Sequence, residues 1–181
     1  AGRLHVLWSA AEASGAPGAA LVYARLESGR WSTPATILRA PEGKSDQPAL
    51  VAVGDRLHAV WSGGPDGRIF YSQAYARDAT TSAGWSEPLA LIENAGSAPQ
   101  LTADLLGRLY AIYAVPLNAG RGIYVTFSDD AGVTWSEPAS VFDAEAAGWL
   151  SVAQPSLSVD EEGRLLAVWV RAPLPGNGPA E

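Results

Sequence analysis

The sequence contains no cysteine, no methionine and only two histidines among its 181 residues. Without cysteine, the chain can form no disulfide and offers no thiolate as a nucleophile or metal ligand. With so few imidazole groups, a transition-metal site built on histidine is not expected, so we predict no metal and no cofactor. The net charge of −7 and a pI near 4.8 argue against a nucleic-acid partner, because phosphate binding needs a basic surface.

Long hydrophobic runs are also absent. No apolar stretch approaches the roughly 18 residues of a membrane-spanning helix, so we predict no membrane span. The sequence begins with neither Met nor a signal-peptide pattern, and its first residues already look like a strand, so we expect a processed or excised end. The chain instead has 19 Gly, 13 Pro and short runs of Val, Ile, Leu and Trp, a composition typical of many short strands joined by turns.

Three short sequences recur along the chain at a common spacing of about 50 residues. One begins Arg-Leu and ends in an aromatic residue, one reads Trp-Ser-x-Pro, and one contains Gln and Pro. Their first residues are Arg3, Arg56, Arg108 and Arg164 for the first, Trp31, Trp85 and Trp135 for the second, and Gln47, Pro99 and Gln154 for the third. Agreement of three independent anchors indicates a true internal repeat.

Each repeat contains strand-like runs that we name A to D in chain order. In the second repeat these are Ala49–Val53, Leu57–Trp61, Ile69–Gln73 and Leu89–Ile92. Four antiparallel strands per repeat are the unit of a β-propeller blade, and runs that are apolar on both faces suit blades packed between neighbours. We therefore predict an all-β chain, a β-propeller segment of about three and a quarter four-stranded antiparallel blades, too few to close a ring.

The positions of the anchors predict where each blade begins and ends. The blades would cover residues 1–172, as repeats 1–46, 47–97, 98–153 and 154–172, followed by a Pro/Gly-rich tail at 173–181. The first repeat lacks strand A, and the fourth ends after strand B. Open strand edges and apolar blade faces promote association, so we expect the remaining propeller blades or a second polypeptide as a partner.

Residues 128–135 read S-D-D-A-G-V-T-W between two strand-like runs. An Asp side chain can accept hydrogen bonds from backbone N–H groups a few residues on, and glycine can adopt the positive φ that such a turn needs. The pattern S-x-D-x-G-x-T-W resembles the Asp box, or BNR repeat, of sialidase-like β-propellers. The resemblance implies a structural turn away from the active site, formed by Ser128, Asp130, Gly132, Thr134 and Trp135.

In an up-and-down blade, the A–B and C–D turns lie on one face, here called the Asp-box face, and the B–C and D–A loops lie on the opposite loop face. The resemblance places ligands on the loop face, where loops are also longer and more varied. Arg68 and Arg121 are candidates to hold a carboxylate, Asp46 is a candidate carboxylate, and Trp149 could stack on a sugar. Ordinary loop residues remain the alternative for each of them. Further carboxylates in these loops are Asp66, Glu93, Asp143 and Glu145.

Residues on the Asp-box face and inside the strands are expected to be structural. The arginines that open the first anchor each adjoin a tight hairpin, which predicts a role in the turn. His5 and His58 lie within strand B, which predicts packing between blades.

Two functions stay open. The first is a non-catalytic module that recognises a glycan or protein ligand, as part of a larger exported protein in the extracellular space or periplasm. The alternative is a fragment of a sialidase-like glycoside hydrolase, an exo-sialidase, whose family needs an arginine cluster and an Arg-Ile-Pro or Arg-Leu-Pro motif. That motif is absent, since Arg68-Ile69-Phe70 lacks the proline, so we name no catalytic residue and favour the recognition module. A role in protein assembly also remains open.

Overall fold

The computed structural model describes residues 3–10, 20–41, 44–93 and 96–171. Within these ranges, the regular structure consists of β-strands and one short 3₁₀ helix, η1 (Ser82–Gly84). The prediction of an all-β chain is therefore confirmed. The tail at 173–181 lies outside the described residues.

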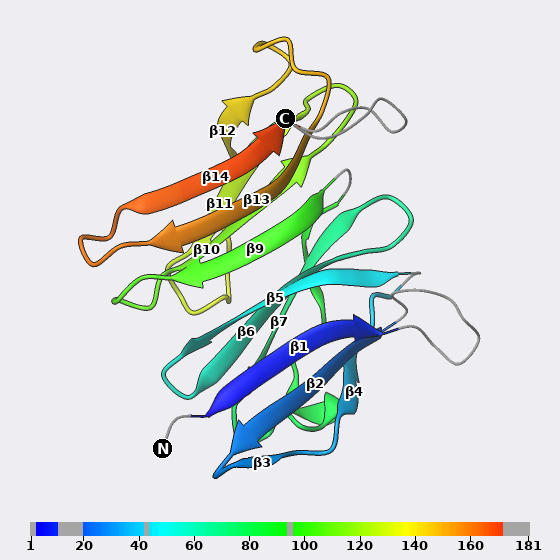
Figure 1. Cartoon of the computed structure of the whole chain (residues 1–181), viewed down its shortest axis with the longest axis vertical. Coiled ribbons are helices and arrows are strands. Elements are labelled where there is room, and N and C mark those ends of the chain that lie inside the picture. Colours follow the sequence, from blue (N-terminus) through cyan, green and yellow to red (C-terminus); the bar gives the residue numbers. More distant parts are fainter. Residues whose placement is uncertain (1–2, 11–19, 42–43, 94–95, 172–181) are drawn as a thin grey trace.

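The strands form four antiparallel sheets that follow one another in chain order (Figure 1). Their bounds are β1 (Leu4–Ala10), β2 (Ala20–Glu27), β3 (Arg30–Trp31) and β4 (Ala35–Leu38); β5 (Ser45–Val53), β6 (Arg56–Gly63), β7 (Arg68–Tyr75) and β8 (Leu89–Ile92); β9 (Ser97–Ala103), β10 (Leu109–Val115), β11 (Gly122–Ser128) and β12 (Ala139–Asp143); and β13 (Val152–Val159) and β14 (Leu165–Arg171).

The sheets are blades of a β-propeller, numbered here 1 to 4. Blades 2 and 3 are complete, with strand orders β5-β6-β7-β8 and β9-β10-β11-β12. Blade 1 starts at strand B: β1, β2 and β4 are strands B, C and D, and the short β3 also pairs with β2. Blade 4 has strands A and B, β13 and β14. Figure 1 shows blades 1 and 4 at opposite ends of the molecule, so the ring is open, as predicted.

Strand A of each later blade contains an irregularity near its start. Gln47, Ala98 and Gln154 have positive φ values of 51°, 48° and 51°, and each precedes a proline. Proline cannot donate to the ladder, and the register of each strand shifts at this point, as in a β-bulge.

The bulge corrects the predicted position of Asp46. Asp46 was predicted to lie in a loop of the loop face, at the end of the D–A loop between blades 1 and 2, but it is the second residue of β5 and pairs with Ser62 of β6. The strand continues through the bulge, so pairing starts two residues before the Gln-Pro sequence that served to mark the start of the repeat.

The core lies between the blades. One buried cluster joins Leu21 and Tyr23 of blade 1 to Trp61 and Phe70 of blade 2. Two further clusters fill the interfaces between blades 2 and 3 and between blades 3 and 4. The strands are thus apolar on both faces because each inner blade packs against two neighbours.

Candidate functional site

The turn at residues 128–135, here called the Asp-box turn after the motif that it resembles, is closed by its own side chains. Gly132 donates its N–H to Ser128 Oγ at 2.8 Å, and Ser128 Oγ donates to Asp130 Oδ1 at 2.8 Å. Thr134 donates its N–H to Asp130 Oδ1 at 2.8 Å and its hydroxyl to Oδ2 at 2.6 Å. These bonds, those of Thr134 above all, hold the pKa of Asp130 at about 2. Both oxygens of the carboxylate thus accept hydrogen bonds from within the turn.

The same turn packs against blade 2. Trp135 meets Tyr71 of β7 edge-on, with ring centroids 5.1 Å apart, and the Tyr71 hydroxyl donates to the Ala131 carbonyl at 3.4 Å. Gly132, at φ +86°, approaches so closely that a Cβ there would lie 1.8 Å from Tyr71 Oη. Glycine is therefore required here both by its φ and by the neighbouring tyrosine.

The hydroxyl of Tyr71 also shares a hydrogen bond with His58 Nδ1, at 2.7 Å. His58 is almost completely buried, and this desolvation lowers its pKa to about 4, while burial raises the pKa of Tyr71. The imidazole is therefore neutral at pH 7. His58 has the packing role that the sequence indicated.

The interface between blades 1 and 2 repeats this arrangement. His5 Nδ1 and Tyr23 Oη are 2.5 Å apart, and Trp85 of blade 2 lies edge-on to Tyr23 at 6.2 Å between ring centroids. In both interfaces, a histidine of strand B bonds a tyrosine of strand C, and the next blade contributes a tryptophan. We call this arrangement the His–Tyr–Trp contact.

The arginines of the first sequence anchor contact neighbouring residues on the Asp-box face. Arg108 forms an ion pair with Asp129 beside the Asp box, and Arg164 bonds Asp160 at 2.6 Å. The guanidinium of Arg56 lies 4.5 Å from the ring centre of Tyr75. These contacts support the structural role that we expected for the row.

On the loop face, both candidate arginines tie strand C to the loop that follows strand D. Arg68 opens β7, and its Nε donates to the Glu93 carbonyl at 3.3 Å. Arg121 precedes β11, and its Nε donates to the Trp149 carbonyl at 2.7 Å. Carboxylates accompany both, with Glu93 Oε2 3.6 Å from Arg68 and Glu145 Oε1 3.7 Å from Arg121.

The structure brings the candidates together in separate groups. Arg121, Glu145 and Trp149 form one group, in which the half-buried Trp149 ring packs on Phe142 with centroids 4.7 Å apart. Asp46 belongs to another, because it accepts hydrogen bonds from Ser9 Oγ at 2.9 Å and the Gln47 N–H at 2.8 Å.

The other carboxylates of these loops have varied roles. Asp143 accepts the Ala146 N–H at 2.9 Å and so caps its own turn, whereas Asp66 is exposed in the turn between β6 and β7.

The role of Gln47 was not predicted from the sequence. Its Oε1 accepts the N–H of Ala98 at 2.9 Å and lies 3.0 Å from Ser62 Oγ, so it joins the bulges of blades 2 and 3. The repeated Gln-Pro sequence, which marks Gln47-Pro48 as a repeat anchor, was the only feature of the sequence that pointed to Gln47. The cross-blade bond could not be read from it, because the bond depends on how the strands A lie side by side.

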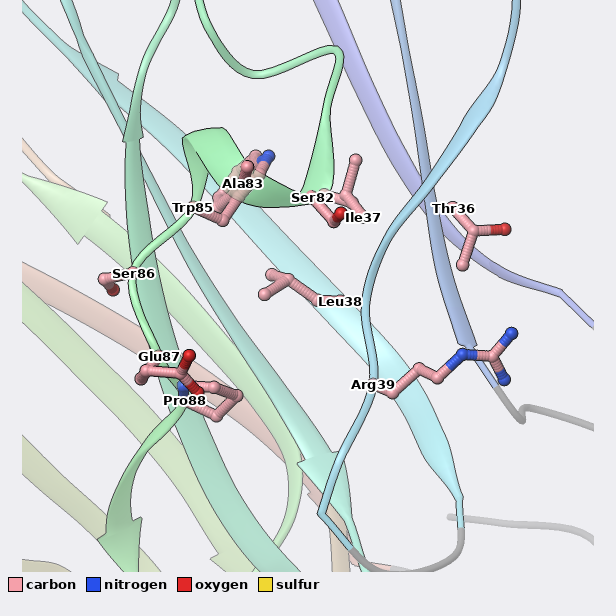
Figure 2. A pocket seen from close by; sticks show the side chains of 10 residues that line it. All are labelled: Thr36, Ile37, Leu38, Arg39, Ser82, Ala83, Trp85, Ser86, Glu87 and Pro88. Atoms are coloured by element: carbon pink, nitrogen blue, oxygen red, sulfur yellow. The ribbon is translucent and has the colours of Figure 1, made fainter.

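A groove of about 570 Å³ was also not predicted from the sequence. It lies between β4 of blade 1 and the segment leading to β8 of blade 2 (Figure 2). Buried apolar side chains and more polar residues share its lining, which comprises Thr36, Ile37, Leu38, Arg39, Ser82, Ala83, Trp85, Ser86, Glu87 and Pro88. The indole N–H of Trp85 already donates to the Ala79 carbonyl at 3.0 Å, so it is engaged within the chain.

No group of three or more His, Asp and Glu side chains in the described ranges is placed to hold a metal ion. Across the same ranges, no helix has the length and apolar character needed to cross a membrane.

No protein-family model matches the sequence, and no curated protein matches it. Among solved structures, the fold is similar to an α-L-arabinofuranosidase from Podospora anserina in complex with cellotriose. The TM-score is 0.53 at 12% sequence identity, over 84% of this chain and 59% of that enzyme's chain. At this identity, the likeness shows the β-propeller fold alone.

Proposed function

We propose that this chain is part of an Asp-box β-propeller module that recognises a glycan or a protein through its loop face, without catalysing a reaction. The observation that carries the proposal is the difference between the two faces. Turns on the Asp-box face are closed by internal bonds, such as those of Asp130. On the opposite face, Arg68 and Arg121 hold longer loops against the blades. Varied loops on a rigid scaffold are a common basis of binding surfaces.

The chemistry of the loop face favours a ligand with a carboxylate. Arg68 and Arg121 use Nε to bond loop carbonyls, and Arg121 also donates from Nη1 to the Asn118 carbonyl at 3.1 Å. Each guanidinium has five N–H donors, so further N–H groups can hold a carboxylate in bidentate fashion. An acidic sugar or an acidic peptide segment meets this requirement. A glycan is the first class to test, because the structurally similar arabinofuranosidase was solved with cellotriose.

The carboxylates of the loop face support binding over catalysis. Asp46 accepts two hydrogen bonds, Glu93 lies beside Arg68, and Glu145 accepts the Gly120 N–H at 3.0 Å beside Arg121. Each carboxylate thus positions a neighbouring group. The alternative, a fragment of a sialidase-like exo-sialidase, requires catalytic groups beyond these. Recognition of polysaccharides suits a protein exported to the extracellular space or periplasm.

Binding to an array of sialylated, uronic-acid and neutral β-linked glycans, followed by calorimetry, tests this proposal. Simultaneous Arg68→Ala and Arg121→Ala should abolish binding of an acidic glycan. The matched control, Arg56→Ala with Arg108→Ala, makes the same charge change on the Asp-box face and should leave binding intact. Equal losses from both pairs would contradict the assignment of the faces.

Activity assays separate the two functions. The chain should not hydrolyse a chromogenic sialoside at a rate above the buffer reaction. Hydrolysis that Asp46→Asn abolishes would replace the recognition module with a glycoside hydrolase. Absence of binding to all glycans and to acidic peptides would also contradict the proposal.

A further inference from the structure

The outward face of blade 1 matches, in sequence, the face of blade 2 that is buried between blades 1 and 2. The sequence Arg3–Trp8 of β1 corresponds position by position to Arg56–Trp61 of β6. In β6, Leu57 and Trp61 are fully buried against blade 1. Their counterparts in β1 are Leu4 and Trp8; Leu4 is 53% exposed, and Trp8 is partly exposed.

The side chains of this outward face alternate with those that pack on blade 2. Leu7 and Tyr23 lie on the inner side, in the cluster shared with blade 2. Side chains of adjacent strand residues point to opposite faces, so their neighbours in sequence point away from blade 2. The outward set comprises Leu4, Val6, Trp8, Val22, Leu26 and Trp31, and we call it the blade 1 outer face.

Trp31 identifies what this face lacks. It is the first of the three Trp-Ser-x-Pro tryptophans, of which Trp85 is 6% exposed against Tyr23 and Trp135 packs against Tyr71. Trp31 is 54% exposed. In both complete interfaces, the tryptophan meets a tyrosine on strand C of the preceding blade, whose hydroxyl is held by a strand B histidine.

We propose that the blade 1 outer face docks a further four-stranded propeller blade, whose strand C presents a tyrosine to Trp31 and whose strand B holds that tyrosine with a histidine. The argument is continuity with the interfaces already present, since the strand B leucine and tryptophan and the Trp-Ser-x-Pro tryptophan of the buried face of blade 2 recur in blade 1 as Leu4, Trp8 and Trp31. The His–Tyr–Trp contact then predicts which side chains the added blade must present to Trp31: a tyrosine on its strand C and a histidine on its strand B. This inference concerns assembly of the ring and stands apart from the ligand of the loop face.

A second copy of this chain does not supply the required partner. Within the described ranges, blade 4 has only strands A and B, and Leu166 occupies the position of His58. In blade 3, Val125 of strand C pairs with Ile112 of strand B, as Tyr71 pairs with Val60 in blade 2. Val125 therefore occupies the position of Tyr71. Neither blade could therefore present the histidine–tyrosine pair to Trp31.

The test places a second copy of residues 44–107 in front of residues 3–181, joined directly to Arg3. Gly107 then precedes Arg3 as it naturally precedes Arg108, and the copy provides a blade with His58 and Tyr71 together with a strand A for blade 1. Proteins labelled with 5-fluorotryptophan are compared by fluorine NMR, and the Trp31 resonance is assigned by its loss in Trp31→Phe.

In the extended chain, the Trp31 resonance should lose most of its H₂O/D₂O isotope shift, and the melting temperature should rise. The same extension with Tyr71→Ala in the copied blade should leave Trp31 more accessible to solvent. An unchanged isotope shift in an extended chain whose circular dichroism shows the added β-structure, and which melts in a single cooperative transition, would overturn the proposal. Equal protection of Trp31 by both extensions would overturn the tyrosine contact.

The unextended chain provides a second test that does not depend on the fusion folding. Trp31→Glu should change its melting temperature little, whereas Trp85→Glu should lower it strongly, because only Trp85 has its partner blade. A comparable loss in both variants would show that Trp31 is already packed, against the proposal. Self-association in sedimentation experiments that Trp31→Glu abolishes would identify a second copy as the occupant and would also overturn it.

Discussion

The ring of Trp135 meets the ring of Tyr71 edge-on across the boundary between blades 2 and 3, with centroids 5.1 Å apart and an interplanar angle of 65°. The Asp-box turn therefore acts between blades as well as within one. Its hydrogen bonds fix the backbone, and Gly132 permits the close approach to Tyr71 that accompanies the aromatic contact. Gly132 and Trp135 thus serve the contact between the blades in addition to the turn itself.

Removing the Tyr71 hydroxyl should destabilise the protein. Tyr71→Phe keeps the ring but leaves the buried His58 Nδ1 without its bond to that hydroxyl, and an unsatisfied buried polar group costs about 1–3 kcal/mol. Urea unfolding followed by tryptophan fluorescence measures the change. Tyr75→Phe is the matched control, since Tyr75 is 37% exposed and should cost much less. Equal costs would show that the His58–Tyr71 bond adds nothing.

The close approach at Gly132 gives a second prediction. Gly132→Ala combines an unfavourable positive φ with a Cβ 1.8 Å from Tyr71 Oη. Gly148→Ala is the matched control, because Gly148 has φ +72° and no atom within 4 Å of the added Cβ. Left-handed backbone strain alone costs about 1–2 kcal/mol, and overpacking adds about 1–3 kcal/mol. Urea unfolding should therefore show the larger loss for Gly132→Ala; equal losses would mean that Tyr71 moves aside without cost.

The sequence predicted the elements whose signals are local. The repeated Arg-Leu, Trp-Ser and Gln-Pro anchors placed the blades, and residues 128–135 predicted a turn with Gly132 at positive φ, as observed. Contacts between blades were not predictable in the same way. Tyr71 and Trp135 meet only because neighbouring sheets stack, and Asp46 joins β5 because a bulge at Gln47 lets the ladder continue.

The candidate site shows the same limit. Arg68 and Arg121 were selected by their matching positions, but their bonds to the Glu93 and Trp149 carbonyls depend on how each loop returns to its blade. Trp149 was proposed as a stacking surface from its loop position alone. In the structure, its ring packs on Phe142, with the Arg171 guanidinium 5.7 Å from the ring centre.

Burial of neutral His58 predicts a pH dependence of stability. Its pKa is about 4 in the folded protein and near 6.5 when unfolded, so between these values the unfolded chain binds a proton that the folded chain excludes. The free energy of unfolding should fall as the pH drops from 6.5 to 4, by about 2 kcal/mol after an allowance for solvent screening, and the His58 contribution should not change below pH 4.

Urea unfolding at intervals of pH measures this dependence. His58→Gln removes the titrating group, so the slope between pH 6.5 and 4 should become shallower than in the unaltered protein. His5→Gln is the matched comparison in the other interface, where a less buried histidine also has a lowered pKa, and its effect should be smaller. Identical slopes for the unaltered protein and His58→Gln would contradict the assignment.

Asp130 predicts a separate loss of stability in stronger acid. The hydrogen bonds from Thr134 lower its pKa from 3.8 to about 2, so the folded state favours the carboxylate more than the unfolded state does. Its stabilising contribution should be present above pH 4 and lost as the pH falls from 4 to 2.

The variant Asp130→Asn tests this dependence, because asparagine preserves the size of the side chain but cannot ionise. Thermal melts followed by circular dichroism should show a lower melting temperature for Asp130→Asn at pH 6 and a difference that narrows towards pH 2. Asp129→Asn, the neighbouring control, removes a carboxylate paired with Arg108 outside the Asp130–Thr134 bonds, and should lower the melting temperature at pH 6 less than Asp130→Asn does. A constant difference between Asp130→Asn and the unaltered protein across this range would show that the charge of Asp130 does not stabilise the turn.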